Sequence, residues 1–446
     1  MMQMDATDKA PSQNGPRAAG TDPADGLYEA ILAGARIPGA TYRVQLNHAF
    51  TFEDATNLVE YLDMLGVTDL YASPFFKARP GSMHGYDLVD HNSLNPEIGT
   101  NAQFDALHAR LSARGMGLVL DFVPNHMGVH TAENAWWMDV LENGPSSLYA
   151  PFFDIDWHPL KSELERRVLL PVLGEHYGTV LENGDLQLSF DHGAFFVRCY
   201  GNPLPLSPRT FPLILEPIVP SLVAALGEED DAVLELMSII TGLGHLPSQG
   251  ETHRARVIER RREKEILKRR LADLVAESPA VARAIEDRIH VMNGQKGDPR
   301  SFDALDALLE NQAYRLSYWR VAAEEINYRR FFDINDLGAI RMENPAVFEE
   351  AHRLLFQLLD EGKVTGLRID HPDGLWAPST YFCRLQRTFF LHRVRRELAG
   401  AEDGKGAAGA LQSLLLSRYD RDVSKKPEDP PRPLYIAVEK ILSRSE

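Results

Sequence analysis

The chain has 446 residues, 44% of them hydrophobic and 25% charged, so it can bury a large core and is longer than one average domain. Acidic residues outnumber basic ones by 64 to 47, and the resulting formal net charge of -17 argues against nucleic acid or an anionic membrane as a partner. Two cysteines are too few for a disulfide framework, and no apolar stretch is expected to span a bilayer. Residues 1–36 lack the apolar segment of a secretory signal. We therefore expect a soluble, cytoplasmic protein with a disordered tail over residues 1–36.

Strand-like runs alternate with amphipathic helices from residue 37 onward. Such alternation predicts right-handed βαβ units, a parallel sheet and ligand binding at the C-terminal ends of its strands. We also expect a further barrel-like run at residues 327–335. The predicted strands cover residues 41–46, 68–72, 117–122, 366–370 and 434–438, and the first two helices cover residues 52–65 and 102–114.

Polar side chains gather where the second and third strands end. His84 and Tyr86 follow the second strand, and Asp121, Asn125 and His126 close the third. A sugar ring has an apolar face that suits an aromatic side chain and a rim of hydroxyls that suits imidazole, amide and carboxylate groups. Each residue is weak evidence by itself, because a lone loop histidine is more often a local hydrogen-bonding partner. Their recurrence at successive strand ends favours a carbohydrate site.

A catalytic metal or other cofactor is not expected. His126 and His130 have the spacing of a helical metal pair, but no glutamate follows His126 as it does in zinc proteases.

Residues 134–326 interrupt the alternation of strands and helices that is typical of a barrel. This stretch predicts β-rich and helical inserted subdomains. The aromatic run at 136–157 is assigned to a core, although it could also line a carbohydrate groove. A β-hairpin is predicted within 181–200, with Asn-Gly and His-Gly turns. The basic stretch 254–274 could suggest nucleic acid, but its glutamates lie within about a turn of its arginines and lysines. We interpret it as a solvated helix with intrahelical ion pairs.

The stretch from Gly366 to Leu375, GLRIDHPDGL, places Asp370 at the end of a buried strand with Arg368 on the same face. The arginine should keep this carboxylate ionised with a low pKa, as a nucleophile requires. Taken alone, the stretch is equally consistent with a structural role, in which the aspartate caps a turn and forms an ordinary ion pair with the arginine. Glu439 ends the following strand, and two such carboxylates roughly 5–5.5 Å apart are what retaining glycoside chemistry needs.

The motifs at 121–126, 366–370 and 438–439 resemble, in chain order, three of the four short signature regions of the α-amylase superfamily. More narrowly, the chain is similar to the maltooligosyltrehalose synthases, which are (1→4)-α-D-glucan 1-α-D-glucosylmutases, from about Pro38 to its last residue. The stretches that carry this narrower resemblance are 42–50, 84–90, 314–335 and 368–375.

The resemblance implies an α/β fold, a (β/α)8 TIM-barrel catalytic domain that stops here after about the fifth strand and has an insertion after strand 3. It divides the chain into strands 1–3 at 37–133, inserted subdomains at 134–326 and strands 4–5 at 327–446. The superfamily's third catalytic carboxylate, an aspartate beside a histidine, cannot be placed before Glu446. We therefore expect the 446-residue chain alone to be inactive.

The resemblance also implies roles for individual residues. Asp370 is the expected nucleophile and Glu439 the expected general acid/base, in an intramolecular transglycosylation that turns the reducing-end α-1,4 bond of a maltooligosaccharide into an α,α-1,1 bond. The implied partners are a linear α-1,4-glucan and, functionally, a maltooligosyltrehalose trehalohydrolase. An α-amylase-type hydrolase, a 4-α-glucanotransferase and a non-catalytic glycan-binding fragment remain as alternatives. The expected substrate-binding residues are Arg368, which also keeps Asp370 ionised, His126, Tyr86, Asp121, Asn125 and, with less definite contacts, His84 and His371.

Overall fold

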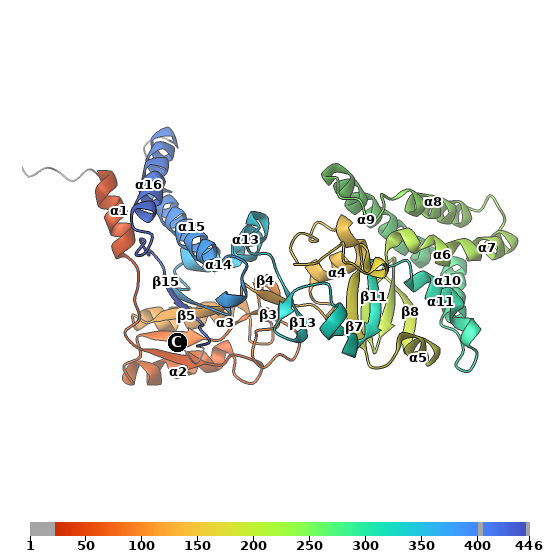
Figure 1. The fold of residues 1–446 in the computed structure, drawn as a ribbon, viewed down its shortest axis with the longest axis horizontal. Helices are drawn as coiled ribbons and strands as arrows, with labels where there is room; N and C mark the ends of the chain where they lie inside the picture. Colours follow the sequence, from red (N-terminus) through yellow and green to blue (C-terminus); the bar gives the residue numbers. More distant parts are fainter. Residues whose placement is uncertain (1–22, 400–404, 443–446) are drawn as a thin grey trace, which may run out of the picture. The chain divides into compact units, whose positions relative to one another are not determined.

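The computed structural model describes residues 23–399 and 405–442 (Figure 1). The chain divides into two compact units. The larger unit comprises residues 37–384 and 436–446, and the smaller comprises residues 1–36 and 385–435.

The larger unit is built on a five-stranded sheet with the order β1-β2-β5-β14-β15. Its first four strands pair in parallel, and Arg368 of β14 lies directly opposite Asp121 of β5. The five strands that the sequence predicts are confirmed; β5 has the predicted bounds and the other four are slightly shorter than expected. Their bounds are β1 Thr41–Val44, β2 Asp69–Ala72, β5 Gly117–Phe122, β14 Gly366–Ile369 and β15 Tyr435–Val438.

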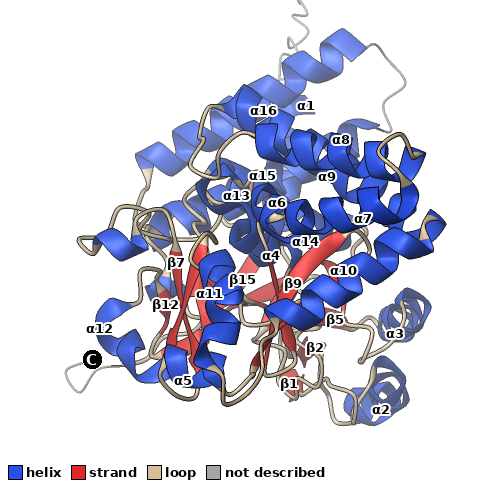
Figure 2. Cartoon of the chain, turned by 90° about the vertical axis from the view of Figure 1, so that its right-hand side faces the viewer, coloured by secondary structure: helices blue, strands red, loops and turns tan. Residues whose placement is uncertain are grey.

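Helices α2 (Phe52–Met64) and α3 (Asn101–Ala113) follow β1 and β2 and pack against each other. Each begins with a capping box, in which a threonine side chain and the residue three positions later satisfy each other's backbone amides. Both helices match the sequence prediction (Figure 2). Helices α13 (Pro345–Ala351) and α14 (Arg353–Asp360) then lead into β14.

Between β5 and β14, where the sequence predicts inserted subdomains at 134–326, the chain forms separate small sheets. Strands β8 (Leu186–Asp191) and β9 (Ala194–Cys199) form the predicted antiparallel hairpin, whereas the segment before them is a helix, α5 (Tyr177–Glu182). The prediction of a barrel-like run at 327–335 is wrong, because β12 (Arg330–Phe331) and β13 (Ile334–Ala339) pair antiparallel with each other and β13 pairs with β6. The remaining strands are β3 Phe76–Ala78, β4 Leu88–Leu94, β6 His126–Gly128, β7 Val168–Leu173, β10 Asn202–Pro205 and β11 Tyr314–Tyr318.

The assignment of the aromatic run to a core holds for Trp136, Trp137, Phe152 and Phe153, which are all buried. The remaining inserted helices are α4 Ala135–Asn143, α6 Pro212–Leu215, α7 Val219–Leu226, α8 Asp231–His245, α9 Arg254–Glu277, α10 Pro279–Met292, α11 Asp303–Leu309 and α12 Ala322–Glu325.

Helix α9 differs from the solvated helix that its sequence suggests. Surface ion pairs such as Arg256–Glu259 do occur along it. Arg260 and Lys264, however, are buried, and each has a partner outside the helix: Lys264 binds Glu142 of α4 and Arg260 contacts Asn143. Tertiary pairing therefore replaces hydration on one face of α9.

The smaller unit contains α1 (Pro23–Ala33), the part of α15 (Pro378–Ala399) from residue 385, and α16 (Lys405–Lys425). Its core joins residues from all three helices, including Tyr28, Phe390 and Tyr419. The expectation of a disordered tail through residue 36 is therefore wrong for 23–33, whereas residues 1–22 lie outside the described part of the chain.

One segment meets the length and composition of a membrane span, contrary to the sequence expectation. Among the described residues, Pro208–Leu226 is sufficiently long and apolar, and 33% of its most apolar window is buried within the protein. The core helix of a soluble protein passes the same test, so this segment is weak evidence for a membrane.

Candidate active site

Arg368 joins three carboxylates at the C-terminal end of the parallel sheet. Its Nη1 lies 2.7 Å from Oδ1 of Asp121 and 2.7 Å from Oδ1 of Asp370, and its Nη2 lies 3.3 Å from Oε2 of Glu439. The parallel register sets Arg368 and Asp121 opposite each other, and alternation along β14 brings Asp370 to the same face. Although burial opposes its charge, the nearby Asp121 and Asp370 raise the pKa of Arg368. The guanidinium is therefore a permanent cation between three acids.

Asp370 is buried, with 6% of its surface exposed. Oδ1 accepts the hydrogen bond from Arg368, whereas Oδ2 has no hydrogen-bond partner within the described residues. Burial raises the pKa of Asp370 to about 6, with smaller contributions from Asp121 and Glu439, and contact with Arg368 only partly offsets this. The low pKa expected from the sequence is therefore wrong, because desolvation outweighs the arginine.

Glu439 reaches the same place from the end of β15. Its amide donates to the carbonyl of Ile369 (3.1 Å), and its Oε2 accepts from the amide of His371 (2.8 Å). His371 has φ +42°, a left-handed conformation that is uncommon for a residue with a side chain. The turn after Asp370 thus fixes the second carboxylate through the backbone.

Asp121 is held by two tyrosine hydroxyls as well as by Arg368. Tyr86 donates to Oδ2 at 2.7 Å and Tyr71 donates to it at 3.1 Å. Arg43 supports this arrangement by donating to the Tyr86 hydroxyl at 3.2 Å. Burial raises the pKa of Asp121, and these donors oppose the rise. Sequence reasoning missed Tyr71 and Arg43, although a polar residue in each of two short predicted strands was the available signal; the two residues lie in register.

His126 and Asn125 form the next layer of the site. Burial lowers the pKa of His126 to about 3, so its imidazole is neutral at physiological pH. Asn125 contacts its Nδ1 at 3.3 Å, whereas its Nε2 has no partner in the described chain. The ring of His126 packs against Phe331 with centroids 4.4 Å apart.

Arg329 is a third residue that the sequence reasoning missed. Its Nη1 donates to Oδ1 of Asn125 at 3.1 Å and to the carbonyl of Gly374 at 2.5 Å, and its Nε donates to Asp154 of the insertion at 2.8 Å. A Cβ at Gly374 would lie 2.4 Å from the ring of His371 and 2.7 Å from Oδ1 of Asn125. Only glycine fits this close approach. Arg329 connects Asp154 to the turn after β14.

His84 and His371 lie at the edge of this cluster. The side chain of His84 is 55% exposed, its Nδ1 accepts from the Tyr86 amide at 3.1 Å, and its ring stacks on that of Tyr86. Burial lowers the pKa of His371, whose ring contacts Phe331 and Phe332. The structure thus joins Asp370, Glu439, Arg368, Asp121 and Tyr86 directly, places His126, Asn125 and His371 around them, and leaves His84 outermost.

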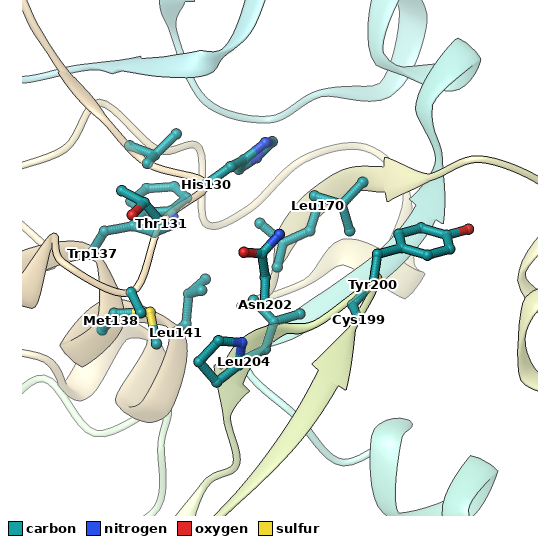
Figure 3. A pocket seen from close by; sticks show the side chains of 14 residues that line it. His130, Thr131, Trp137, Met138, Leu141, Leu170, Cys199, Tyr200, Asn202 and Leu204 are labelled. Atoms are coloured by element: carbon teal, nitrogen blue, oxygen red, sulfur yellow. The ribbon is translucent and has the colours of Figure 1, made fainter. Parts of the chain in front are cut away.

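The cavity in Figure 3 is a different feature, in the inserted part. It measures about 60 Å³ and is lined by His130, Trp137, Leu170, Tyr200 and other residues, none of them from the carboxylate cluster. Across residues 23–399 and 405–442, no group of three or more His, Cys, Asp or Glu side chains could hold a metal ion.

Comparison with known proteins gives consistent matches. Residues 52–178 match the alpha amylase catalytic domain. A Mycobacterium tuberculosis protein described as a maltooligosyl trehalose synthase is 33% identical over 354 residues, which are 78% of this chain and 32% of that protein. The solved structure of maltooligosyltrehalose synthase from Arthrobacter ramosus is 31% identical with a TM-score of 0.53, over 79% of this chain and 34% of that one.

Shorter matches reach other enzymes, such as an intracellular maltogenic amylase of Bacillus subtilis, 37% identical over 105 residues covering 24% of this chain and 17% of that protein. The chain spans about a third of the length of the trehalose synthases that it matches. Signature motifs, catalytic-domain match and solved structures agree: the chain is similar to the alpha amylase catalytic domain over residues 52–178 and to the maltooligosyl trehalose synthases over 78% of its length.

Proposed function

We propose that this chain carries the catalytic site of a glucosylmutase that converts the reducing-end α-1,4 bond of a maltooligosaccharide into an α,α-1,1 bond, giving maltooligosyl trehalose. One observation carries the proposal: Arg368 gathers Asp121, Asp370 and Glu439, while Oδ2 of the buried Asp370 is left without a partner in the described chain. A buried carboxylate oxygen with no donor is costly, and the anomeric carbon of a bound sugar supplies its missing contact.

In the first step, Asp370 attacks the anomeric carbon as Glu439 protonates the glycosidic oxygen. The carbon–oxygen bond breaks, a covalent glycosyl-enzyme ester forms, and the reducing-end glucose is released within the site. Arg368 stabilises the ionised form of Asp370 before the attack. The hydroxyl of Tyr86, the imidazole of His126 and the amide of Asn125 are the proposed contacts to the sugar.

In the second step, the freed glucose turns and its own anomeric hydroxyl attacks the anomeric carbon of the glycosyl-enzyme, breaking the bond from that carbon to Asp370. Glu439 now accepts the hydroxyl proton, the α,α-1,1 bond forms and Asp370 leaves as a carboxylate. The glucose must be retained between the steps, so water must be kept out. The inserted part suits this task, because Arg329 bonds both its Asp154 and the turn that carries the catalytic residues.

The five-stranded sheet supports a wider proposal about the fold. We assign its strands to the first five of a (β/α)8 barrel, with strands 1–3 in 37–133, inserted subdomains in 134–326 and strands 4–5 in 327–446. The parallel register and sequential strand order of β1, β2, β5 and β14 support this assignment. A cytoplasmic location and functional coupling to a trehalohydrolase follow from the same proposal.

Product analysis tests the reaction. The full-length protein is incubated with maltopentaose, and the products are separated by anion-exchange chromatography before and after glucoamylase treatment. We expect a non-reducing pentasaccharide that yields trehalose. Maltose and maltotriose alone would identify a hydrolase, and longer maltooligosaccharides would identify a 4-α-glucanotransferase. The absence of any product would identify a protein that only binds glycans.

Two variants test the roles. Asp370→Asn should abolish turnover while glucan binding persists, because remote subsites supply affinity. Glu439→Gln should still form a glycosyl-enzyme from a glycosyl fluoride, whose leaving group needs no protonation, and mass spectrometry should detect the ester. Substantial turnover by Asp370→Asn would remove the nucleophile assignment, and failure to trap any ester with Glu439→Gln would remove the acid assignment.

A further inference from the structure

A second cavity of about 230 Å³ lies in the inserted part, bounded by β11, the start of α5 and the end of α11. Its walls combine aromatic side chains with charged groups of both signs, the arginines Arg167 and Arg315 and the acid Glu310. Within the described chain, none of these residues belongs to the cluster around Arg368. The cavity is therefore built from elements other than those that hold the catalytic carboxylates.

The polar groups that a ligand can reach lie on the open part of the cavity wall. Arg315 and Glu310 are exposed, and Arg167 is half-buried. Tyr314 also lines the cavity, but only 1% of its surface is exposed and its hydroxyl is enclosed within the protein. The guanidinium and carboxylate groups are therefore the ones suited to ligand hydroxyls.

Aromatic side chains continue from the cavity to the surface. The rings of His176 and Tyr318 lie 5.2 Å apart, and Trp319 follows with its centroid 6.0 Å from Tyr318. Trp319 is 51% exposed, and Arg320 lies over both rings at 5.7 and 5.4 Å. Arg320 can thereby hold the two rings in place, leaving an open aromatic surface beside a polar cavity.

We propose that this cavity and its aromatic rim, Tyr318 and Trp319, form a second binding site for a neutral α-glucan. Sugar rings stack on aromatic faces, while their hydroxyls both donate and accept, which suits arginine, glutamate and tyrosine on the same walls. The identity of the sugar rests on the proposed function, whereas the existence of the site rests on the cavity. The chain continues from Trp319 through α12 to Arg329, so a glucan bound here lies on the segment that leads to the catalytic turn.

Affinity electrophoresis through gels that contain amylose tests the site in the full-length protein. Trp319→Ala should weaken retardation about tenfold, because a stacked ring is lost. Tyr61→Ala removes a similarly exposed ring, 54% exposed on α2, and should leave retardation unchanged. Turnover of maltotriose, too short to occupy both sites, should be unchanged in both variants.

Arg315→Ala gives an independent measurement. Removal of an exposed side chain should change the melting temperature little, yet weaken amylose binding about threefold because the ligand loses a hydrogen bond. Unchanged retardation in both Trp319→Ala and Arg315→Ala would overturn the second site. Competition by inorganic phosphate at millimolar concentration would overturn the sugar assignment in favour of an anion. Failure of the proposed function appears separately, as an absence of trehalose-yielding product from the unmodified protein.

Discussion

At the scale of single residues, Asp370 carries opposing demands. As the proposed nucleophile, Asp370 must be an anion, yet its carboxylate is almost completely buried and shares its surroundings with Asp121 and Glu439. One arginine offsets part of this cost by contacting all three acids. A pKa of about 6 still leaves Asp370 mostly ionised at pH 7. The site therefore holds a reactive anion at a cost to the fold.

The pH dependence of kcat/KM should show this directly. Since protonation of Asp370 removes the nucleophile, kcat/KM should fall as the pH decreases below about 6. Arg368→Lys replaces the guanidinium, whose two terminal nitrogens reach several acids, with a single ammonium group. The acid limb of the kcat/KM profile should therefore move to higher pH. Asp373→Asn, on the same turn but paired with the exposed Lys440 at 3.1 Å, is the matched control and should leave the limb in place. An acid limb that does not move in Arg368→Lys would show that the limb does not report the ionisation of Asp370.

The same environment predicts a stabilising substitution. A rise of the Asp370 pKa from 3.8 to about 6 means that holding the anion in the fold costs about 3 kcal/mol at neutral pH. Asp370→Asn should remove this cost and raise Tm at pH 7. Because the native pKa is raised, the cost grows between pH 3.8 and 6 and is absent below pH 3.8. Differential scanning calorimetry at pH 4 and pH 7 should show a larger gain at pH 7, and an equal change at both values would contradict the argument.

At the scale of elements, pairing between α4 and α9 shows what periodicity can and cannot predict. The alternation of strands and helices located β1, β2, β5, β14 and β15, because burial imposes a period that the sequence displays. The Arg368–Asp370 contact was also predictable, because side chains that are two positions apart on a strand lie on the same face. Arg329 and the buried cations of α9 were not, because their partners lie far away in the chain. Contacts between distant segments carry no local signal.

Glu142 provides a test of the α4–α9 pairing. Although burial opposes its charge, Lys268 and Lys264 lower the pKa of Glu142 to about 2. Glu142→Gln leaves Lys264, whose side chain is 3% exposed, with a weaker set of partners, so the free energy of unfolding should fall by about 3–5 kcal/mol. Glu235→Gln breaks the surface pair with Arg270 (2.8 Å) and should cost less than about 1 kcal/mol. Urea unfolding compares them, and equal losses would show that burial is not the cause.

At the scale of the whole larger unit, three imidazoles are enclosed as neutral groups. His91 donates from Nε2 to the carbonyl of Val123 (3.1 Å), and His352 donates from Nδ1 to the carbonyl of Phe348 (2.8 Å). Together with His126 at the active site, they lie near the C-terminal part of β5 and the helix before β14. Burial lowers the pKa of His91 to about 4 and the pKa of His352 to about 3. Neutral histidine is thus part of the packed interior.

These histidines predict how the unit responds to acid. Because their native pKa values lie below the unfolded value of about 6.5, unfolded chains bind more protons between pH 6.5 and 4, and stability should fall as pH decreases through this window. Each histidine can contribute on the order of 3 kcal/mol, which exceeds the opposing effect of Asp370 in sum. His91→Asn should therefore reduce the slope of the unfolding free energy against pH between pH 6 and 5. The reduction should correspond to nearly one proton taken up on unfolding. His245→Gln, at an exposed position on α8, should leave the slope unchanged, and the same slope in all three proteins would show that the buried imidazoles do not govern acid unfolding.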